Sequence, residues 1–575
     1  MDRRHFFKLI AASAGAVSLP LAGDLGCATK RSTRNSSLSG GGSPTSFPVS
    51  DWQAVVKEGW GTAGAQAGPD TWDGVPLQAP AGISDLTGEG RFQADWNSLL
   101  AYDAPEWYRD AKFGIWAHWS PQCVPEDSDW YARNMYIQGQ GQYRNQVKRY
   151  GHPSVFGYKD LCAQWTLLNW EPEALIERYK KAGARLFLAL ANHHDGFDTW
   201  NSKYHAWNAQ NIGPRRDVIG DWTAAARNQG LRVGVTVHAA RNWWWFQVSH
   251  LCDRTGPLAG VPYDGHLTLN DGQGQWWQGY DPQQLYCRKH GARENPDEAY
   301  VRNFYNRVRD LIDLHDPDLL YFDNGGLPLG WAGMNIAAYF YNHNLRTRGG
   351  NMEAVLNIKQ VPDSHAKAVV ADYERGVTNR IMPYAWQSET CLGDWHYNRA
   401  RFLHHSYMKP GQAIHWMVDA VSKNGTFILN VPGKPDGTID ADEKAIVDAI
   451  GSWLQINGEA IYATRPWKVF GEGEHQAQGG AFHGAGQLDA RDVRFTRNKR
   501  GDVVYAIVLG WPDGDSFAIN NLGTDASAQP GGVKNVELLG SQEKLDWNQT
   551  ADSLTVKKPA AKPCDFACAL KVSLA

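Results

Sequence analysis

The sequence predicts an α/β protein whose main part is a (β/α)8-type barrel, followed by a small C-terminal all-β sandwich. Two observations predict the barrel. Apolar runs of strand length alternate with helical segments from about residue 105 to 465, and several of these runs end in polar or aromatic residues. In such barrels the carboxyl ends of the strands carry the functional groups. A third observation, the change of pattern after residue 465, predicts the sandwich.

Individual barrel elements follow from apolar periodicity and from the residues at the segment ends. The helix predicted at 172–182 starts with Pro172 and is followed by Gly183, the usual asymmetry of helix ends. Repeated strand–helix units at this spacing indicate a parallel sheet. The predicted strands are 113–119, 186–191, 231–237, 319–322, 354–358 and 426–431, with a further apolar run at 368–371. The predicted helices are 172–182, 222–229, 299–315 and 443–457.

The last part of the chain has a different pattern, in which short β-type segments are separated by turns rich in Gly, Asp and Asn. We therefore predict a barrel domain over 105–465 and a β-sandwich over 466–575. The predicted sandwich strands are 491–496, 502–509, 535–539 and 553–557.

The N-terminus carries an export pattern. Arg3 and Arg4 precede two phenylalanines and a lysine, and an apolar stretch of small residues follows from 9 to 22. This order is typical of twin-arginine signals, and the stretch is too short for a membrane span. We predict an export signal over 1–27, a tether and N-terminal extension over 28–104, and a periplasmic or secreted protein. Lipid attachment at Cys27 stays open, because Asp24 makes its surroundings a poor lipidation motif.

Composition narrows the function classes. The chain has 26 Trp, 23 Tyr and 19 Phe, and flat aromatic side chains suit sugar surfaces as well as core packing. A formal net charge of -4, with both signs mixed, points to neither nucleic acid nor an anionic membrane surface as a partner. The cysteines show no zinc-type spacing, while Cys564 and Cys568 are near enough in sequence to bridge in an oxidising compartment. Composition leaves the oligomeric state open.

Polar and aromatic residues follow four predicted strands. Asp323 ends the run 319–322 and precedes Asn324 and two glycines, whose bare backbone is expected to let a ligand approach. For this Asp alone, capping of the next helix is an equal alternative. The other three strand ends carry His118 with Trp119, His193 with His194, and His238. Because the strand ends of a barrel meet on one face, we expect these side chains to line one site.

A metal site is one interpretation of these residues, with His118, His193 and Asp323 as its ligands. Adjacent residues on a strand point in different directions, so His193 and His194 are poorly placed to share an ion. We therefore expect no metal and no cofactor. A metal-dependent hydrolase would instead lose its activity to chelators.

An ordered series of motifs carries a family resemblance. One of them runs from Trp107 to Trp119, and another reads His193-His194-Asp195-Gly196-Phe197. The full series covers 107–119, 130–136, 193–197, 200–204, 216–220, 422–431, 435–439, 456–462 and 465–467. As a set it resembles the family 29 α-L-fucosidases. The resemblance implies removal of terminal α-L-fucose from oligo- or polysaccharides by double displacement, with retention of configuration.

The resemblance also implies roles for single residues. Asp323 matches the nucleophile position. Lys359 stands where the family often has an Arg, and it supplies charge without a bidentate fork. The expected substrate-binding residues, from the resemblance and from the strand ends together, are His118, Trp119, Trp130, His193, His194, His238 and Lys359.

The acid/base residue has two candidates. Many family members have Trp-Glu where this chain has Trp386-Gln387, and a Gln side chain cannot deliver a proton. Glu389 follows two residues later, while Glu374 lies after the apolar run 368–371. We prefer Glu374 because it is at a predicted strand end with Gly376 behind it. A simple ion pair with Arg375 or with a nearby Lys is the structural alternative for Glu374.

Two other functions remain as alternatives. The family commonly has tyrosines where this chain has Thr236-Val237-His238, so the sugar pocket is expected to differ around one hydroxyl. L-galactose is L-fucose with a hydroxyl added at C6, which makes α-L-galactosidase an alternative substrate hypothesis. A non-catalytic carbohydrate-binding protein is the second alternative, because of Gln387. A retaining enzyme needs its acid/base about 5–5.5 Å from the nucleophile, and that distance separates catalysis from binding alone.

Overall fold

The computed structural model describes residues 49–57, 71–528 and 530–575. The predicted export signal at 1–27, Cys27 and the first part of the predicted tether lie outside the described residues, so they remain predictions. Across the described ranges, no helix is both long enough and apolar enough to cross a membrane.

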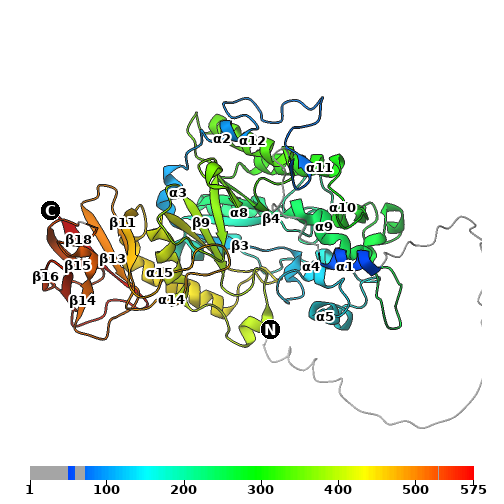
Figure 1. Ribbon diagram of the computed structural model, residues 1–575. Coiled ribbons are helices and arrows are strands. Elements are labelled where there is room, and N and C mark those ends of the chain that lie inside the picture. Colours follow the sequence, from blue (N-terminus) through cyan, green and yellow to red (C-terminus); the bar gives the residue numbers. More distant parts are fainter. Residues whose placement is uncertain (1–48, 58–70, 529) are drawn as a thin grey trace, which may run out of the picture. The chain divides into compact units, whose positions relative to one another are not determined.

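The predicted barrel is confirmed. Eight parallel strands close into a ring in the order β10-β3-β4-β5-β6-β7-β8-β9 (Figure 1). The barrel strands are largely buried except β8, which is partly exposed, since helices and loops cover the outer face and side chains fill the interior. The strands are β3 Phe113–Ala117, β4 Leu186–Asn192, β5 Arg232–Val237, β6 Leu319–Gly325, β7 Val355–Lys359, β8 Val370–Glu374, β9 Trp386–Cys391 and β10 Gly425–Asn430.

Strand β9 was not predicted from the sequence. Its residues 387–390 are all polar, although all of them are buried in the fold. The strand pairs with β8 on one side and β10 on the other, so the ladder satisfies its backbone. An apolar pattern search misses such a strand, because its interior face carries polar groups that bond one another.

The helices surround the barrel unevenly. The long helices α11 and α12 pack against each other outside the ring (Figure 1). Between β7 and β8 the chain makes only a short 3-10 turn, Asp363–His365, and the connection from β8 to β9 contains no helix. The α-helices are α1 Val49–Lys57, α2 Trp96–Leu99, α3 Glu106–Ala111, α4 Tyr131–Asn134, α5 Gly141–Arg149, α6 Tyr158–Gln164, α7 Pro172–Lys181, α8 Val218–Asn228, α9 Asn242–Trp245, α10 Pro282–Tyr286, α11 Glu298–His315, α12 Trp331–Thr347, α13 Arg399–Leu403, α14 Pro410–Ser422 and α15 Ala441–Asn457.

Helix boundaries follow local capping. Helix α15 begins at a capping box, in which Asp440 accepts from the Glu443 backbone and Glu443 accepts from the Asp440 backbone. Helix α8 begins four residues before the predicted start, because the Asp217 side chain caps it by accepting from Gly220 N at 2.8 Å.

The C-terminal part consists of two antiparallel sheets around their own apolar core, as predicted. The five-stranded sheet has the order β11-β12-β13-β18-β15, and the three-stranded sheet has the order β14-β17-β16. Its core includes Trp467, Phe495, Phe517 and Leu570. The strands are β11 Arg465–Glu472, β12 Val493–Arg497, β13 Val503–Val508, β14 Ser516–Ile519, β15 Val533–Leu538, β16 Trp547–Gln549, β17 Leu554–Lys557 and β18 Cys568–Leu574.

Cys564 and Cys568 do not form the disulfide that their spacing allowed, because both are free cysteines. The Cys568 thiol instead lies 3.3 Å from the Gly510 carbonyl, and the Cys564 thiol lies 3.1 Å from the Ala567 carbonyl.

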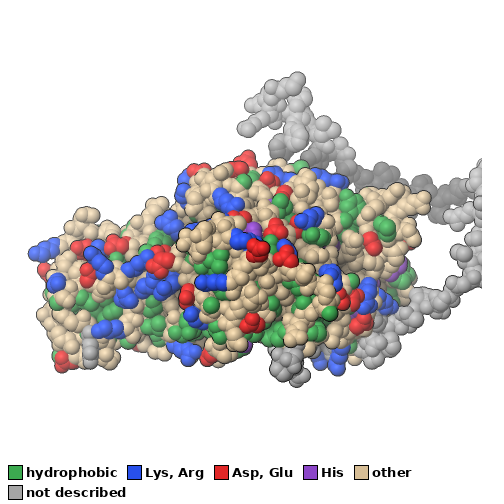
Figure 2. Space-filling model, turned by 90° about the horizontal axis from the view of Figure 1, so that it is seen from above, with side chains coloured by type: hydrophobic (Ala, Val, Ile, Leu, Met, Phe, Trp, Pro, Cys, Tyr) green, Lys and Arg blue, Asp and Glu red, His purple; other side chains and the backbone are tan. Residues whose placement is uncertain are grey.

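Figure 2 shows basic and acidic side chains intermixed over the face that it presents, as the small net charge predicts.

Candidate active site

The carboxyl ends of the barrel strands surround a cavity of about 550 Å³. Ligand pockets commonly have this size, and this end of a barrel is where they form. Residues from seven of the eight strands or their following turns reach it, so the site depends on barrel closure. The predicted residues that line it are His118, Trp130, His193, His194, His238, Asp323, Lys359, Glu374 and Glu389.

Asp323 occupies a bulge in β6. The pairing of β6 with β7 shifts between Phe322 and Gly325, and such a bulge turns a side chain out of regular register. One Asp323 oxygen lies 3.1 Å from His238 Nδ1 and 3.2 Å from His194 Nε2. The other oxygen accepts from the Lys359 ammonium.

The surroundings of Asp323 keep it ionised. Burial would raise the pKa of Asp323, but the Lys359 ammonium and His238 outweigh burial and hold the pKa well below its ordinary value. An ionised carboxylate at the strand end is the form that a nucleophile requires.

The two glycines after Asp323 serve packing within the protein, which corrects the expectation that they admit a ligand. A Cβ atom on Gly325 would lie 2.4 Å from the Gln360 side chain. A Cβ atom on Gly326 would lie 1.9 Å from Trp72, and Gly326 also has a φ of +89°, which favours glycine. The N-terminal extension therefore reaches the loop that follows the candidate nucleophile.

Lys359 joins two carboxylates. Its Nζ donates to Asp323 and lies 2.5 Å from Glu374 Oε2, whereas the nearest Glu389 oxygen is 3.9 Å away. Burial would lower the pKa of Lys359, but Asp323, Glu374 and Glu389 outweigh it and hold the pKa well above its ordinary value. Two hydrogen bonds of about 2.7–3.2 Å to one nitrogen keep the two bonded oxygens within about 6 Å. This limit is compatible with the separation of a retaining carboxylate pair.

Glu374 and Glu389 are neighbours across β8 and β9, but they differ in access. They are paired in register, and paired residues of parallel strands point to the same face. The Glu374 side chain is 17% exposed, whereas Glu389 is 1% exposed. Burial, followed by the nearby Asp372, raises the pKa of Glu389 well above its ordinary value. A raised pKa suits an acid, but a substrate oxygen can reach Glu374 more easily.

A second polar layer lies beneath these two glutamates. Gln387 donates from Nε2 to Asp372 Oδ1 at 2.9 Å, and the Tyr321 hydroxyl donates to Glu389 Oε1 at 3.0 Å. Burial raises the pKa of Asp372 to about 7, with Lys359 offsetting part of the effect. Gln387 is therefore a hydrogen-bond donor inside the barrel.

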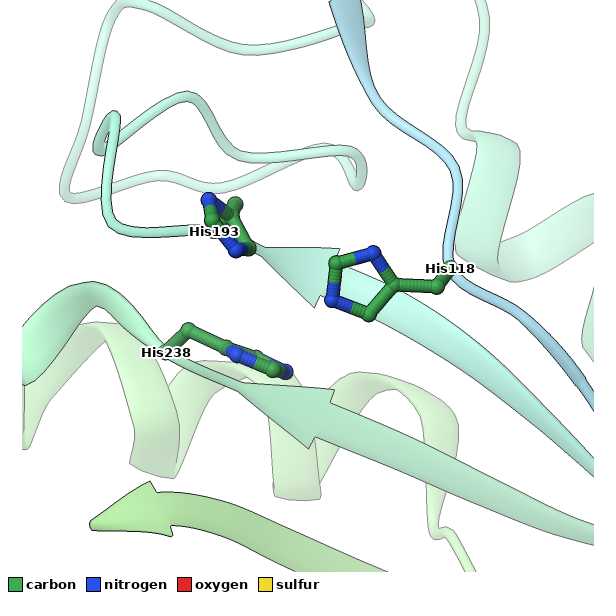
Figure 3. Close-up of side chains that lie close together, drawn as sticks. All are labelled: His118, His193 and His238. Carbon is green, nitrogen blue, oxygen red and sulfur yellow. The ribbon is translucent and has the colours of Figure 1, made fainter. Parts of the chain in front are cut away.

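Three histidines converge from the ends of β3, β4 and β5 (Figure 3). The ligand-capable atoms of His118, His193 and His238 lie within 4.8 Å of one another, so their spacing alone would suit a metal ion. Burial is the main reason that the pKa values of His118 and His193 lie well below their ordinary value, and it lowers the pKa of His238 to about 4. At neutral pH all three rings are therefore neutral.

Hydrogen bonds assign tautomers to two of these rings. The Gln122 amide nitrogen lies 2.6 Å from His193 Nδ1 and 2.8 Å from an Asp195 oxygen, so Gln122 donates and His193 carries its proton on Nε2. His238 donates from Nδ1 to Asp323, which leaves Nε2 as an acceptor. His238 Nε2 and His118 Nδ1 have no hydrogen-bond partner among the described residues. A donor beside an acceptor suits hydroxyl groups better than a cation, which needs only lone pairs.

Trp119 corrects the predicted set. It follows His118 at the end of β3 but faces the other side of the chain, where it packs against Trp165 and Trp170. Its indole nitrogen donates to the Lys434 carbonyl at 3.1 Å. Trp119 is thus a core residue and is not among the residues that line the cavity.

Sequence reasoning missed several lining residues. Asp129 fixes the position of Trp395 by accepting hydrogen bonds from the backbone N–H groups of Trp395 and His396. Trp395 was missed because it follows β9, a strand that the sequence did not predict. The missed aromatic and basic lining residues include Trp116, Tyr321, Arg375, Trp395 and Phe482.

A closed parallel barrel with several carboxylates gathered in one cavity at its strand ends is an arrangement that glycoside hydrolases use. Comparisons with known proteins then specify the family. Residues 83–459 match the family Alpha-L-fucosidase, and residues 488–573 match the Alpha-L-fucosidase C-terminal domain. The chain therefore belongs to the α-L-fucosidase family of glycoside hydrolases.

Individual relatives are similar over most of their length. Tissue alpha-L-fucosidase of Homo sapiens is 26% identical over 496 residues, which cover 84% of this chain and 92% of that protein. An alpha-L-fucosidase of Branchiostoma floridae is 25% identical over 500 residues, covering 84% and 96%. The crystal structure of Thermotoga maritima alpha-fucosidase has a TM-score of 0.62 at 26% identity, covering 84% of this chain and 100% of that one. That protein has also been solved in complex with fucose.

Proposed function

We propose that this protein is an exported, retaining exo-α-L-fucosidase that removes terminal α-L-fucose from glycans. The observation that carries the proposal is the Lys359 ammonium, which bonds to both Asp323 and Glu374. It supports a carboxylate pair at the spacing of a double displacement, and it weighs against a barrel that only binds sugar. The twin-arginine pattern at Arg3 and Arg4 supports export.

In the first step, Asp323 attacks the anomeric carbon and Glu374 gives its proton to the glycosidic oxygen as that bond breaks. A fucosyl ester on Asp323 results, and the rest of the glycan leaves as an alcohol. In the second step, Glu374 takes a proton from water, and the water oxygen displaces Asp323. Two inversions at one carbon return the α configuration.

The remaining polar groups bind and orient the sugar. His193 offers an N–H donor and His238 an acceptor, so the pair can bond to neighbouring ring hydroxyls. The indole faces of Trp116 and Trp395, whose centroids are 5.4 Å apart, provide apolar surface for the C5 methyl group. A methyl at this carbon is what separates L-fucose from L-galactose.

The test is Asp323→Gly, assayed with an aryl α-L-fucoside and with the matching α-L-galactoside. We expect no measurable turnover, because the nucleophile is gone, and recovery with added azide as the inverted β-fucosyl azide. Wild-type preference for the fucoside supports the assigned sugar. Full activity of Asp323→Gly, or a product of retained configuration in azide, would overturn the proposal.

A further inference from the structure

A loop from the sandwich side of the chain covers part of the barrel. We call residues 474–489, which lie between β11 and β12, the platform loop. Its two ends are held by the buried Asp492 carboxylate, which accepts from His475 N and from Asp489 N at 2.9 Å each. Its residues Ala477 and Ala485 are buried in one apolar cluster with Val377 and Trp386. The platform loop thus packs where the connection from β8 to β9 has no helix.

The tip of the platform loop is bonded to the backbone that follows the candidate acid. Phe482 N donates to the Glu374 carbonyl at 2.8 Å, Gly480 N donates to the Val377 carbonyl at 2.8 Å, and Gly484 N donates to the Arg375 carbonyl at 2.9 Å. These three bonds fix the loop tip relative to Glu374. Any group that the tip presents therefore has a defined position beside the acid/base.

Phe482 is the group that the tip presents. Its side chain is 67% exposed, which is unusual for so large an apolar residue, and its φ of +64° is a backbone conformation that such residues rarely adopt. Strain of this kind persists only where the surrounding structure over-determines it, and it concentrates at functional sites. Its ring belongs to none of the apolar clusters formed by the described residues.

Phe482 and Arg375 line two cavities at once. One is the fucose cavity described above, and the other is a neighbouring cavity of about 720 Å³. The second cavity carries both hydrogen-bonding groups and an aromatic face, among them Arg401, Gln412 and Trp416. A mixture of polar groups and flat apolar surface is what a sugar ring requires.

We propose that the Phe482 ring is the platform for the sugar unit that carries the fucose, and that the second cavity receives the glycan beyond that unit. The inference rests on the proposed function, because it assumes that Glu374 protonates the oxygen between the two sugars. The preferred substrates are then fucosylated oligosaccharides, in which the leaving group is itself a sugar. Simple fucosides use only the first cavity.

The test compares two substrates that share the fucosyl group. In an α-L-fucosyl-galactose disaccharide the leaving group is a sugar ring, whereas in α-L-fucosyl fluoride it is a single atom. The variant is Phe482→Gly, since glycine adopts a positive φ without strain and the loop is expected to keep its fold. We expect kcat/KM to fall about tenfold for the disaccharide, and to change less than about twofold for the fluoride.

Controls separate the ring from the loop. Phe482→Trp should keep activity on the disaccharide, because another aromatic face replaces the first. Leu168→Ala removes an even more exposed apolar side chain, 83% exposed, that lines neither cavity, and it should leave kcat/KM for both substrates unchanged. Equal losses on both substrates, or no loss on the disaccharide, would overturn the inference. If the wild type hydrolyses neither substrate, the proposed function itself fails.

Discussion

Lys359 is the residue on which the site's geometry depends. A guanidinium at this position would bind one carboxylate through two parallel bonds, whereas an ammonium is a compact charge with three separate donors. Here those donors reach Asp323 and Glu374, and the third carboxylate, Glu389, lies at 3.9 Å. The Lys359 ammonium and His238 keep Asp323 ionised against the effect of its burial, whereas burial, followed by the nearby Asp372, drives Glu389 toward its protonated form.

The acid/base assignment can be tested through the leaving group. Glu374→Ala should lower kcat/KM about 10²–10⁴-fold for a disaccharide, but far less for a dinitrophenyl fucoside, whose leaving group needs little protonation. Azide should accelerate this variant and give the fucosyl azide of retained configuration. Glu389→Gln is the matched comparison, because Gln can still accept from the Tyr321 hydroxyl.

For Glu389→Gln we expect a smaller loss that does not depend on the leaving group. If the two variants show the opposite pattern, Glu389 is the acid. Its raised pKa then keeps it protonated for donation to the leaving group.

The raised pKa of Asp372 should make the stability of the fold depend on pH. Burial raises its pKa from the ordinary 3.8 to about 7. Between these values the folded protein binds one proton more than the unfolded chain, so this group's contribution to stability falls as pH rises from about 4 to 7. In Asp372→Asn that contribution is absent, and the Asn oxygen can still accept from Gln387.

The measurement is the urea midpoint of wild type and variant at several pH values across this range. We expect the difference between variant and wild type to shift in favour of the variant as pH rises. A constant difference would show that Asp372 does not take up a proton on folding.

At the scale of elements, one section of the barrel has connections between its strands that contain no α-helix. Strands β7, β8 and β9 follow one another without an α-helix between them, and they carry Lys359, Glu374 and Glu389. The short connections put three charged side chains side by side, and the platform loop closes the outside. A loop between the sandwich strands β11 and β12 therefore packs where a helix between β8 and β9 would otherwise lie.

Helix α15 follows β10, the last barrel strand, and the cap at its start allows a prediction about stability. Asp440 caps the helix and also accepts from the Tyr407 hydroxyl at 2.6 Å. Asp440→Ala should therefore cost about 1–2 kcal/mol, from the lost cap and a buried hydroxyl left without its acceptor. The check is a lower thermal midpoint with unchanged KM. Asp440→Asn, which can still cap, should recover most of the loss.

At the scale of the molecule, a buried ion cluster connects the barrel to the sandwich. Asp419 on α14 accepts from Arg494 on β12 at 2.7 Å and from Lys423 at 2.6 Å, and all three side chains are 1% exposed or less. Apolar residues of β13 and β18 also belong to the same core cluster as the barrel. The two parts are therefore expected to unfold together.

Removing one member of this cluster should be costly. Arg494→Ala leaves the Asp419 carboxylate buried with a single partner, and breaking such a pair costs about 3–5 kcal/mol. We expect a large drop in the urea midpoint that affects tryptophan signals of both parts in one transition. Arg500→Ala, whose side chain is 80% exposed, is the control and should change little. Two separate transitions in the Arg494 variant would contradict the coupling.

The sequence by itself determined the parts of the site that lie within single strands. Alternation of strands and helices predicted the barrel, and the position of Asp323, His118, His193 and His238 at strand ends predicted that they would meet. These are local signals, because one strand end carries both the apolar run and the polar residue that follows it.

Only the tertiary structure decided which groups act on one another. Barrel closure and strand register decide three features of the site. They bring Lys359 into contact with Glu374, bury Glu389 and place Trp119 in the core. Phe482 reaches the acid from more than a hundred residues further along the chain. Such contacts leave no local periodicity, because they join segments that the fold alone brings together.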